Sequence, residues 1–413
     1  MKPITKLIHH PYQAPGDFKS PQLPVYKASS VFFNHVEDMR HRQWLDKSGY
    51  TYGLHGTPST FTLEERLCEL EGAKHCVLLP SGLAALAQVN LALLAAGDEI
   101  LLPDNIYGPL KTLAEGELTR FGVTHQFYDP MQVDDLAKRL SAKTKLVWLE
   151  APGSVTLEFP DLPRLVQICR ANGVLCALDN TWGAGLAFQP FHLPSANPGE
   201  FLGVDISVHA LTKYPSGGGD VLMGSVTTCH DDIARSLKLS HMRMGFGVAG
   251  NDVELVLRSL PSMALRYRAQ DLNCRELAAW CLQQSAFAQV LHPAVATSPG
   301  HDHWRHLCAS NELSDGPVHP GGSAASLLSL RFQPHITPAQ VDAFCNALQL
   351  FKLGYSWAGP ISLVVPYNLK SMRAHAPAHL TEGGFVRLSL GLEDPADLQA
   401  DLAQALAVAL GQG

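Results

Sequence analysis

Short apolar runs alternate with helical stretches through the first half of the chain, and this pattern limits the possible folds more than any other feature. Strands that alternate with helices favour a mostly parallel sheet with helices over both faces. The expected strands lie at 77–79, 100–102, 124–128, 146–149 and 174–178, and the expected helices at 61–71, 82–96 and 162–171. We therefore expect an α/β fold built on a mostly parallel central sheet.

The pattern changes twice along the 413 residues, which predicts an arm and two domains. Residues 1–60 are rich in Pro, Tyr, Ser and His and keep no regular period, so we expect an extended N-terminal arm that needs a partner surface. Residues 61–260 carry the alternation, and residues 261–413 are expected to form a smaller α+β domain. Its expected elements are a helix at 264–283, strands at 325–332 and 385–390, and helices that begin at Pro338 and Pro395.

The charge distribution argues against two classes of partner. The formal net charge is −7, and the lysines and arginines form no basic run, so the usual attraction to nucleic acid or to anionic lipid is missing. The longest apolar run, residues 83–96, is interrupted by Gln88 and Asn90 and is too short to cross a bilayer. We expect neither a nucleic-acid partner nor a membrane partner.

Nine cysteines and nineteen histidines raise the question of a metal site. The closest cysteine spacings, Cys169 to Cys176 and Cys274 to Cys281, are too wide for a zinc knuckle or a redox pair, so we interpret these residues as core thiols. Three histidines within residues 301–306 lack a matching cysteine or carboxylate pattern, and we expect no metal. Reduced cysteines, and a start without the apolar stretch of a secretory signal, predict a cytoplasmic protein.

The apolar run at residues 174–178 leads directly into Asp179. In open α/β sheets, ligands bind at the carboxyl ends of the strands, so this carboxylate is a candidate functional group. It can bind a magnesium ion, transfer a catalytic proton or keep a pyridine nitrogen protonated. Asp179 alone does not decide between these roles.

Lys213 follows a second apolar run, residues 204–208, and precedes a glycine-rich turn at 217–219. Partial burial at a sheet edge lowers the pKa of a lysine and makes it nucleophilic, whereas the alternative is an ordinary surface lysine before a loop. Together, Asp179 and Lys213 are the two groups that pyridoxal 5'-phosphate (PLP) requires: an amine for its aldehyde and a partner that keeps its ring nitrogen protonated. The pair therefore predicts PLP as the cofactor.

Residues 80–83, Pro-Ser-Gly-Leu, open the expected helix and offer a place for a phosphate. The first amides of a helix are unpaired and lie at the positive end of its dipole. A serine N-cap on a buried helix is the alternative interpretation. The chain contains no Walker A sequence, so the usual nucleoside-triphosphate site is not expected.

Two further side chains suit a flat cofactor with an amino-acid substrate. Tyr107 follows the expected strand at 100–102, where its ring can lie on a cofactor; the alternative is a half-buried turn tyrosine. Arg387 lies within an apolar strand, where a charge is costly unless an anion meets it. A substrate carboxylate would meet the guanidinium with two hydrogen bonds, and a structural ion pair is the alternative.

Seven stretches of the sequence resemble the Cys/Met-metabolism family of fold-type I PLP enzymes, and within it the bacterial cystathionine β-lyases. They follow the family's order from the arm to the last strand, so the resemblance covers nearly the whole chain. The segment YSW is similar to the β-lyase branch rather than to the γ-lyase and γ-synthase branch. The stretches are PVYKASS (24–30), YGLHGT (52–57), LEGA (70–73), DNTW (179–182), TKY (212–214), YSW (355–357) and RLSLGLED (387–394).

The resemblance implies the fold-type I PLP-dependent transferase fold and a role for each candidate at the cofactor ring. Residues 61–260 would bind PLP, with Lys213 bonded to its aldehyde, Asp179 paired with its pyridine nitrogen and Tyr107 stacked on its ring. Lys213, Tyr107 and Asp179 are the expected catalytic residues.

For the phosphate, the resemblance implies the backbone amides of Gly82 and Leu83, the hydroxyl of Thr212, and Tyr52 from the neighbouring subunit's arm. Many family members have an arginine two residues after this tyrosine, but this chain has Leu54 followed by His55. Because that charge is missing, we hypothesise weaker or differently arranged phosphate binding, with more of it left to the helix end.

For the substrate, the resemblance implies that residues 261–413 bind the carboxylate through Arg387, with Ser356 and Trp357 shaping the pocket. The implied activity is cleavage of cystathionine, or of a related cysteine thioether, to a thiol, pyruvate and ammonia in methionine biosynthesis or transsulfuration. Pro360-Ile361 stands where β-lyases often carry a glutamate, which leaves the preferred thioether open.

Three alternatives to this activity remain. One is a γ-lyase or γ-synthase on the same scaffold, another is a different cysteine-S-conjugate lyase, and the third is a PLP-fold protein that only binds a regulatory partner. The complete set of Tyr107, Asp179, Lys213 and Arg387 counts against a mere binding module. The resemblance also implies a homotetramer made of two active dimers.

Overall fold

A seven-stranded sheet occupies the centre of the computed structural model, which describes residues 1–9, 21–195, 199, 201–309, 316–373, 380 and 382–411. Strand β7 pairs antiparallel with both of its neighbours, and the other pairings are parallel. In spatial order the strands are β1 (His75–Leu79), β7 (Gly224–Thr228), β6 (Ile206–His209), β5 (Leu175–Asp179), β4 (Thr144–Glu150), β2 (Glu99–Pro103) and β3 (Thr124–Tyr128). The expectation of a mostly parallel sheet is confirmed.

Helices cover both faces of this sheet because alternate side chains of its strands point to opposite sides. The helices are α3 (Pro58–Glu71), α4 (Gly82–Leu93), α5 (Gly108–Leu113), α6 (Val133–Arg139), α7 (Leu162–Ala171), α8 (Asp231–Met244) and α9 (Gly250–Ser259). In β4, Leu146 and Trp148 pack into the core beneath α4 and α8, whereas Val147 and Leu149 pack into the core beneath α3, α6, α7 and α9. Helix α4 ends at Leu93 rather than at the expected residue 96, because Leu94 adopts an extended conformation.

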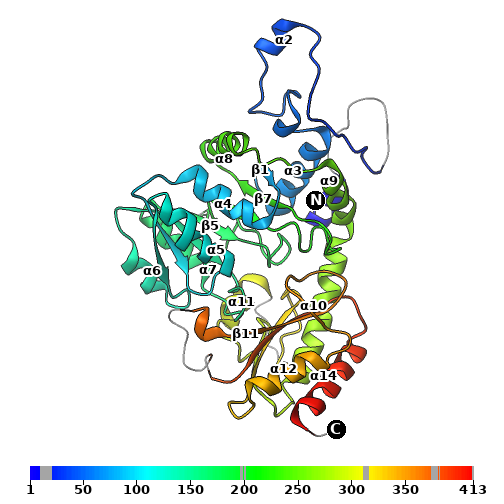
Figure 1. Cartoon of the computed structure of the whole chain (residues 1–413). Coiled ribbons are helices and arrows are strands. Elements are labelled where there is room, and N and C mark those ends of the chain that lie inside the picture. The colour runs from blue at the N-terminus through cyan, green and yellow to red at the C-terminus, as the bar shows by residue number, and fades with distance from the viewer. Residues whose placement is uncertain are drawn as a thin grey trace.

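The C-terminal part of the chain builds a second, five-stranded sheet with its own apolar core. Its strands, in spatial order, are β10 (Lys352–Leu353), β11 (Leu363–Tyr367), β12 (Phe385–Ser389), β9 (Leu327–Phe332) and β8 (Phe287–Leu291). Its helices are α10 (Met263–Cys281), α11 (His301–Cys308), α12 (Pro338–Ala347) and α14 (Pro395–Leu410). Figure 1 shows the long helix α10 running from the first sheet towards the second. The expected α+β elements are therefore present, and their assignment to a separate domain stays our interpretation.

The N-terminal segment is less uniform than an extended arm. Residues 3–8 form helix α1 (Pro3–Ile8), which contacts α3 and buries Leu7 in the main core. Pro3 stands in the first turn, where its missing N–H costs nothing, and one apolar residue is too little to reveal such a short helix in the sequence. Residues 21–57 carry the short helix α2 (Val36–Arg40), and the part around α2 projects away from both sheets (Figure 1). Among the described residues, no helix is long and apolar enough to span a membrane.

Candidate active site

A cavity of about 430 Å³ opens at the carboxyl ends of β4 and β5, between the first sheet and the C-terminal sheet. This is the edge where open α/β sheets bind ligands. Nine of the ten residues singled out from the sequence line it: Gly82, Leu83, Tyr107, Asp179, Thr212, Lys213, Ser356, Trp357 and Arg387. The tenth, Tyr52, lies elsewhere.

Asp179 is the last residue of β5, and its carboxylate is held by the turn that follows. The Thr181 backbone N–H and hydroxyl both donate to Asp179 Oδ1, at 3.1 and 2.6 Å. The same hydroxyl accepts the backbone N–H of Ala210 at 3.0 Å, which ties this turn to the segment that carries Lys213. Burial raises the pKa of Asp179, although the bonds from Thr181 and the charge of Lys213 oppose the rise.

The Lys213 ammonium lies inside the cavity rather than on the surface. Its Nζ donates to Ser356 Oγ at 2.6 Å and lies 5.4 Å from the centre of the Trp357 ring. Ser356 takes a left-handed backbone conformation with φ of 89°, which non-glycine residues seldom adopt and which marks a site held in place by its surroundings. Burial, and then the charge of Arg387, lowers the pKa of Lys213 to about 8. At pH 7, the Lys213 amine is then neutral in about one molecule in ten, and this fraction is enough for it to act as a nucleophile.

The other end of the cavity is formed by the N-terminus of α4. Ser81 caps this helix by accepting the Ala84 N–H at 3.0 Å, so the amides of Gly82 and Leu83 are left without a partner in the helix. A Cβ at Gly82 would lie 2.6 Å from Ala210 Cβ, so this close approach requires glycine. The serine N-cap is therefore present. The next two amides stay available, and a phosphate bound by them stays a prediction.

Thr212 lies beside this helix end but its hydroxyl is already engaged. It accepts the backbone N–H of Met223 at 3.1 Å and donates to the Met223 carbonyl at 3.3 Å. The cavity residues around Gly82, namely Ser81, Leu83, Ala210 and Thr212, are uncharged. A phosphate would therefore depend on backbone amides here, and any contact with the Thr212 hydroxyl would replace a bond to Met223.

Arg387 points into the cavity from β12 and is 6% exposed. Its Nη1 donates to the Ser154 carbonyl at 3.4 Å, and its guanidinium lies 5.4 Å from the centre of the Tyr367 ring. Its Nε has no hydrogen-bond partner within the described part of the chain. Burial lowers the pKa of this guanidinium. A buried cation with an unused donor fits an anionic ligand better than a purely structural role.

Tyr107 is bound to a carboxylate that the sequence interpretation missed. Its backbone N–H donates to Glu150 Oε2 at 2.8 Å. Glu150 ends β4, pairs with Asp179 across the sheet and lines the cavity. Burial, and then the charge of Asp179, raises the pKa of Glu150 well above its usual range. Its position at the end of the apolar run 146–149 is the same signal that identified Asp179, so it could have been found.

Tyr52 lies outside the cavity, at the start of the 3-10 turn Gly53–His55. Its side chain is 44% exposed, and its ring centre lies 5.8 Å from that of His55. Leu54 and His55 line a different cavity, with Trp44 stacked on His55 at 4.8 Å. The expectation that this arm serves a neighbouring subunit stays a prediction, because a single chain does not test it.

The residues of the cavity fit PLP. A buried carboxyl at a strand end, an amine with a lowered pKa, unpaired helix amides and a guanidinium with an unused N–H match the ring nitrogen, the aldehyde, the phosphate and a substrate carboxylate. The geometry thus supports the cofactor that the sequence predicts.

Comparisons with known proteins agree with this geometry. The model of the Cys/Met metabolism PLP-dependent enzyme family matches residues 4–407. The cystathionine beta-lyase of Bordetella avium is 34% identical over 98% of both chains, and the cystathionine beta-lyase MetC of Escherichia coli is 31% identical over 92% of this chain and 91% of that protein. The crystal structure of metB from Corynebacterium glutamicum superposes with a TM-score of 0.84 at 26% identity and covers 98% of both chains. The chain belongs to the Cys/Met metabolism family of PLP-dependent enzymes.

Proposed function

We propose that the chain is a carbon–sulfur β-lyase that cleaves cystathionine, or a related cysteine thioether, to a thiol, pyruvate and ammonia. Family membership and two relatives named as cystathionine beta-lyases support the reaction class. The observation that carries the proposal is one cavity that holds Lys213, with a pKa of about 8, and the buried Arg387, with an unused N–H. An amino-acid substrate needs one base and one carboxylate partner, and these residues supply both.

Four groups of this chain would hold the cofactor. Lys213 would bond to the PLP aldehyde, Asp179 would hydrogen-bond to the ring nitrogen, and Tyr107 would lie on the ring. The amides at the start of α4 would bind the phosphate. When bound, PLP supplies an electron sink that stabilises negative charge at the substrate Cα.

Two side chains would then act on the substrate. Arg387 binds the α-carboxylate and orients the Cα–H bond for removal. Lys213 would accept the α-proton, because its lowered pKa leaves it partly neutral near pH 7. The Cβ–S electron pair leaves with the sulfur, which takes up a proton to become the free thiol. Water then replaces the amino group, so one thioether and one water give one thiol, one pyruvate and one ammonia.

The side chains of Ser356 and Trp357 would tune this proton transfer. Ser356 Oγ accepts from Lys213 Nζ, and the centre of the Trp357 ring lies 5.4 Å from the same Nζ. Both contacts place the amine in the cavity before substrate arrives. A hydrogen bond and a ring face together fix the direction of Nζ more firmly than either contact alone.

The decisive experiment identifies the oxoacid released from cystathionine by the purified, PLP-loaded protein. A β-lyase gives pyruvate and homocysteine, whereas a γ-lyase gives 2-oxobutyrate and cysteine. Thiol release from cystine, S-alkylcysteines and methionine, measured in parallel, ranks the substrates and separates other cysteine-S-conjugate lyases. A coloured protein that releases no thiol from any of these compounds would favour the binding-only alternative.

We also propose that two copies of the chain share their active sites, with Tyr52 and its neighbours in the arm contacting the PLP phosphate of the partner, and that two such dimers form a tetramer. The high exposure of the arm, including Phe32 at 95% and Tyr52 at 44%, supports a partner surface. Analytical ultracentrifugation tests the assembly.

We also propose a cytoplasmic location, because the nine free cysteines suit a reducing compartment.

A further inference from the structure

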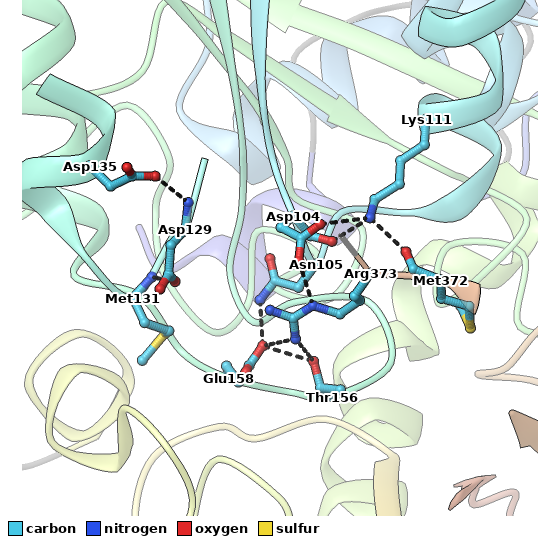
Figure 2. A network of polar contacts seen from close by, with 10 residues as sticks. All are labelled: Asp104, Asn105, Lys111, Asp129, Met131, Asp135, Thr156, Glu158, Met372 and Arg373. Carbon is cyan, nitrogen blue, oxygen red and sulfur yellow. Dashed lines mark hydrogen bonds and ion pairs between the residues drawn. The ribbon is translucent and has the colours of Figure 1, made fainter. Parts of the chain in front are cut away.

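A network of buried charges joins the first sheet to the C-terminal segment beside the active-site cavity (Figure 2). Arg373, just after the 3-10 turn Leu369–Ser371, lies between two carboxylates of the other part of the chain. Its Nε donates to Asp104 Oδ2 at 3.0 Å, and its Nη1 donates to Glu158 Oε2 at 2.8 Å and to Thr156 Oγ1 at 3.2 Å. One guanidinium thus connects three loops that are far apart in the sequence.

The members of the network are shielded from water. The side-chain exposures are 6% for Arg373, 1% for Asp104 and 3% for Glu158. Buried ion pairs of this kind are specific, because removing one partner leaves the other as an uncompensated buried charge. Glu158 is further bound by Asn105 Nδ2 at 2.9 Å, which fixes the direction of its carboxylate. The network therefore holds the loops in one arrangement.

Lys111 adds a second connection from helix α5 to the same segment. Its Nζ donates to the Met372 carbonyl at 2.8 Å and also contacts the carbonyl and Oδ1 of Asp104. Figure 2 shows this ammonium reaching towards both residues. Lys111 thus holds the Met372 backbone, while two carboxylates hold the Arg373 side chain. We call Asp104, Lys111, Glu158 and Arg373 the clasp.

The clasp borders three parts of the active-site cavity. Asp104 lies three residues before Tyr107, and Glu158 lies four residues after Ser154, whose carbonyl accepts from Arg387. Met372 lines the active-site cavity itself. A second cavity of about 360 Å³ lies on the clasp side of this wall, and Val155 and Met372 line both cavities. Gly108 and Pro109 also line both cavities, so Met372 is one part of the wall between them.

We propose that Arg373 is a positioning residue that, through the clasp, holds Met372 in place, and that the distal half of the substrate side chain packs against Met372. This inference rests on the proposed function, since it assigns the substrate's leaving-group half to the Met372 side of the cavity. The ligand class is an amino acid with an unbranched side chain longer than that of alanine. A short side chain does not reach the wall, so its binding is independent of the clasp.

The test compares two inert amino acids, alanine and norleucine, whose binding to the PLP-loaded enzyme is followed by the change in visible absorbance. In Arg373→Gln, we expect the dissociation constant of norleucine to rise about tenfold while that of alanine changes less than about twofold. Lys111→Met, which loses the bond to the Met372 carbonyl but keeps the Arg373 pairs, gives a smaller rise in the same direction. Met372→Ala reproduces the selective loss without touching the clasp.

Lys370→Met is the matched control, because it removes an exposed cation three residues away for which no clasp bond exists. It should leave both dissociation constants unchanged. If Arg373→Gln does not fold, the double variant Glu158→Gln/Arg373→Gln replaces it. This variant also neutralises Glu158, which would otherwise stay charged without Arg373, while Asp104 keeps its ion pair with Lys111. Equal changes for alanine and norleucine, or no change for either, would mean that the clasp has a structural role only.

The proposed lyase activity is judged separately in the same preparations. Wild type and Lys370→Met should release thiol and pyruvate from cystathionine. Absence of that release, with a selective norleucine effect still present, would reject the lyase activity and leave the clasp in place. Normal release with no selective effect would reject the clasp alone, and a wild type that neither releases thiol nor binds either amino acid would overturn both proposals.

Discussion

The active-site cavity and the arm at residues 21–57 differ in how far this chain alone completes them. In the cavity, Arg387 is 6% exposed, and Asp179 and Lys213 are bound by named neighbours. In the arm, Phe32 is 95% exposed and Val36 is 62% exposed. The cavity residues are held by contacts within this chain, whereas the arm leaves apolar side chains exposed to water, which is unfavourable.

The residues proposed for catalysis therefore all lie in the cavity, whereas part of the proposed binding of the cofactor phosphate depends on the arm. The proposed base, ring partner and carboxylate-binding arginine, which are Lys213, Asp179 and Arg387, come from one chain, and burial shifts the pKa of each. The phosphate end has uncharged side chains around Gly82 and depends on helix amides. We therefore expect changes in the cavity to abolish turnover, and changes in the arm to alter cofactor affinity by modest factors.

The largest expected effect in the cavity is that of Lys213→Ala. It removes both the amine that bonds PLP and the base that takes the α-proton, so the turnover number should fall on the order of 10⁴-fold or more. The visible absorbance of the bound cofactor should be lost as well. Both quantities are measured on purified protein dialysed against PLP. A variant that keeps its colour and its thiol release would remove Lys213 from the assigned role.

Arg387→Gln should have the next largest effect. Loss of the charged partner of the substrate carboxylate should lower kcat/KM about 10²- to 10³-fold, while the absorbance of bound PLP stays near that of wild type. Arg331→Gln is a suitable control, because Arg331 lies on the adjacent strand β9 and its Nη1 binds the Glu382 carbonyl at the surface. If both variants lose activity to the same degree, the effect belongs to the sheet and not to carboxylate binding.

Sequence patterns predicted the part of the site that follows from strand ends. Asp179 and Lys213 stand after apolar runs, so their positions follow from the parallel sheet. Arg387 was found as a charge within an apolar run, and its strand β12 belongs to the second sheet, where it pairs antiparallel with β11 and β9. Glu150 carries the same signal and was missed. Tyr367 and Arg373 carry no local signal, because their roles depend on contacts with Arg387 and Glu158 that come from distant segments. Helix α1 was missed because its one buried side chain, Leu7, forms no periodic pattern.

The pH dependence of PLP binding tests whether the cavity alone, without the arm, lowers the pKa of Lys213. The neutral amine of Lys213 is the form that reacts with the aldehyde, and burial has lowered its pKa to about 8. Below pH 8, the neutral fraction rises about tenfold for each pH unit, and above pH 8 it levels off. The rate at which apoenzyme captures PLP, followed by absorbance, should show the same profile. A rate that keeps rising beyond pH 9 would indicate an ordinary, solvated lysine.

The smallest expected effect is an increase in the affinity for PLP, and it comes from a substitution in the arm. Leu54 is uncharged where many family members have an arginine, and in the proposed dimer Leu54→Arg would bring a cation to the partner's phosphate. A partly exposed ion pair contributes up to about 1 kcal/mol, so the dissociation constant of PLP should fall by about fivefold at most. Titration of apoenzyme measures it, and the gain should shrink as ionic strength rises. Leu265→Arg, at a residue 72% exposed on α10, makes the same change of charge elsewhere. Equal effects of the two variants would show that the gain reflects net charge, and the arm would then have no special access to the phosphate.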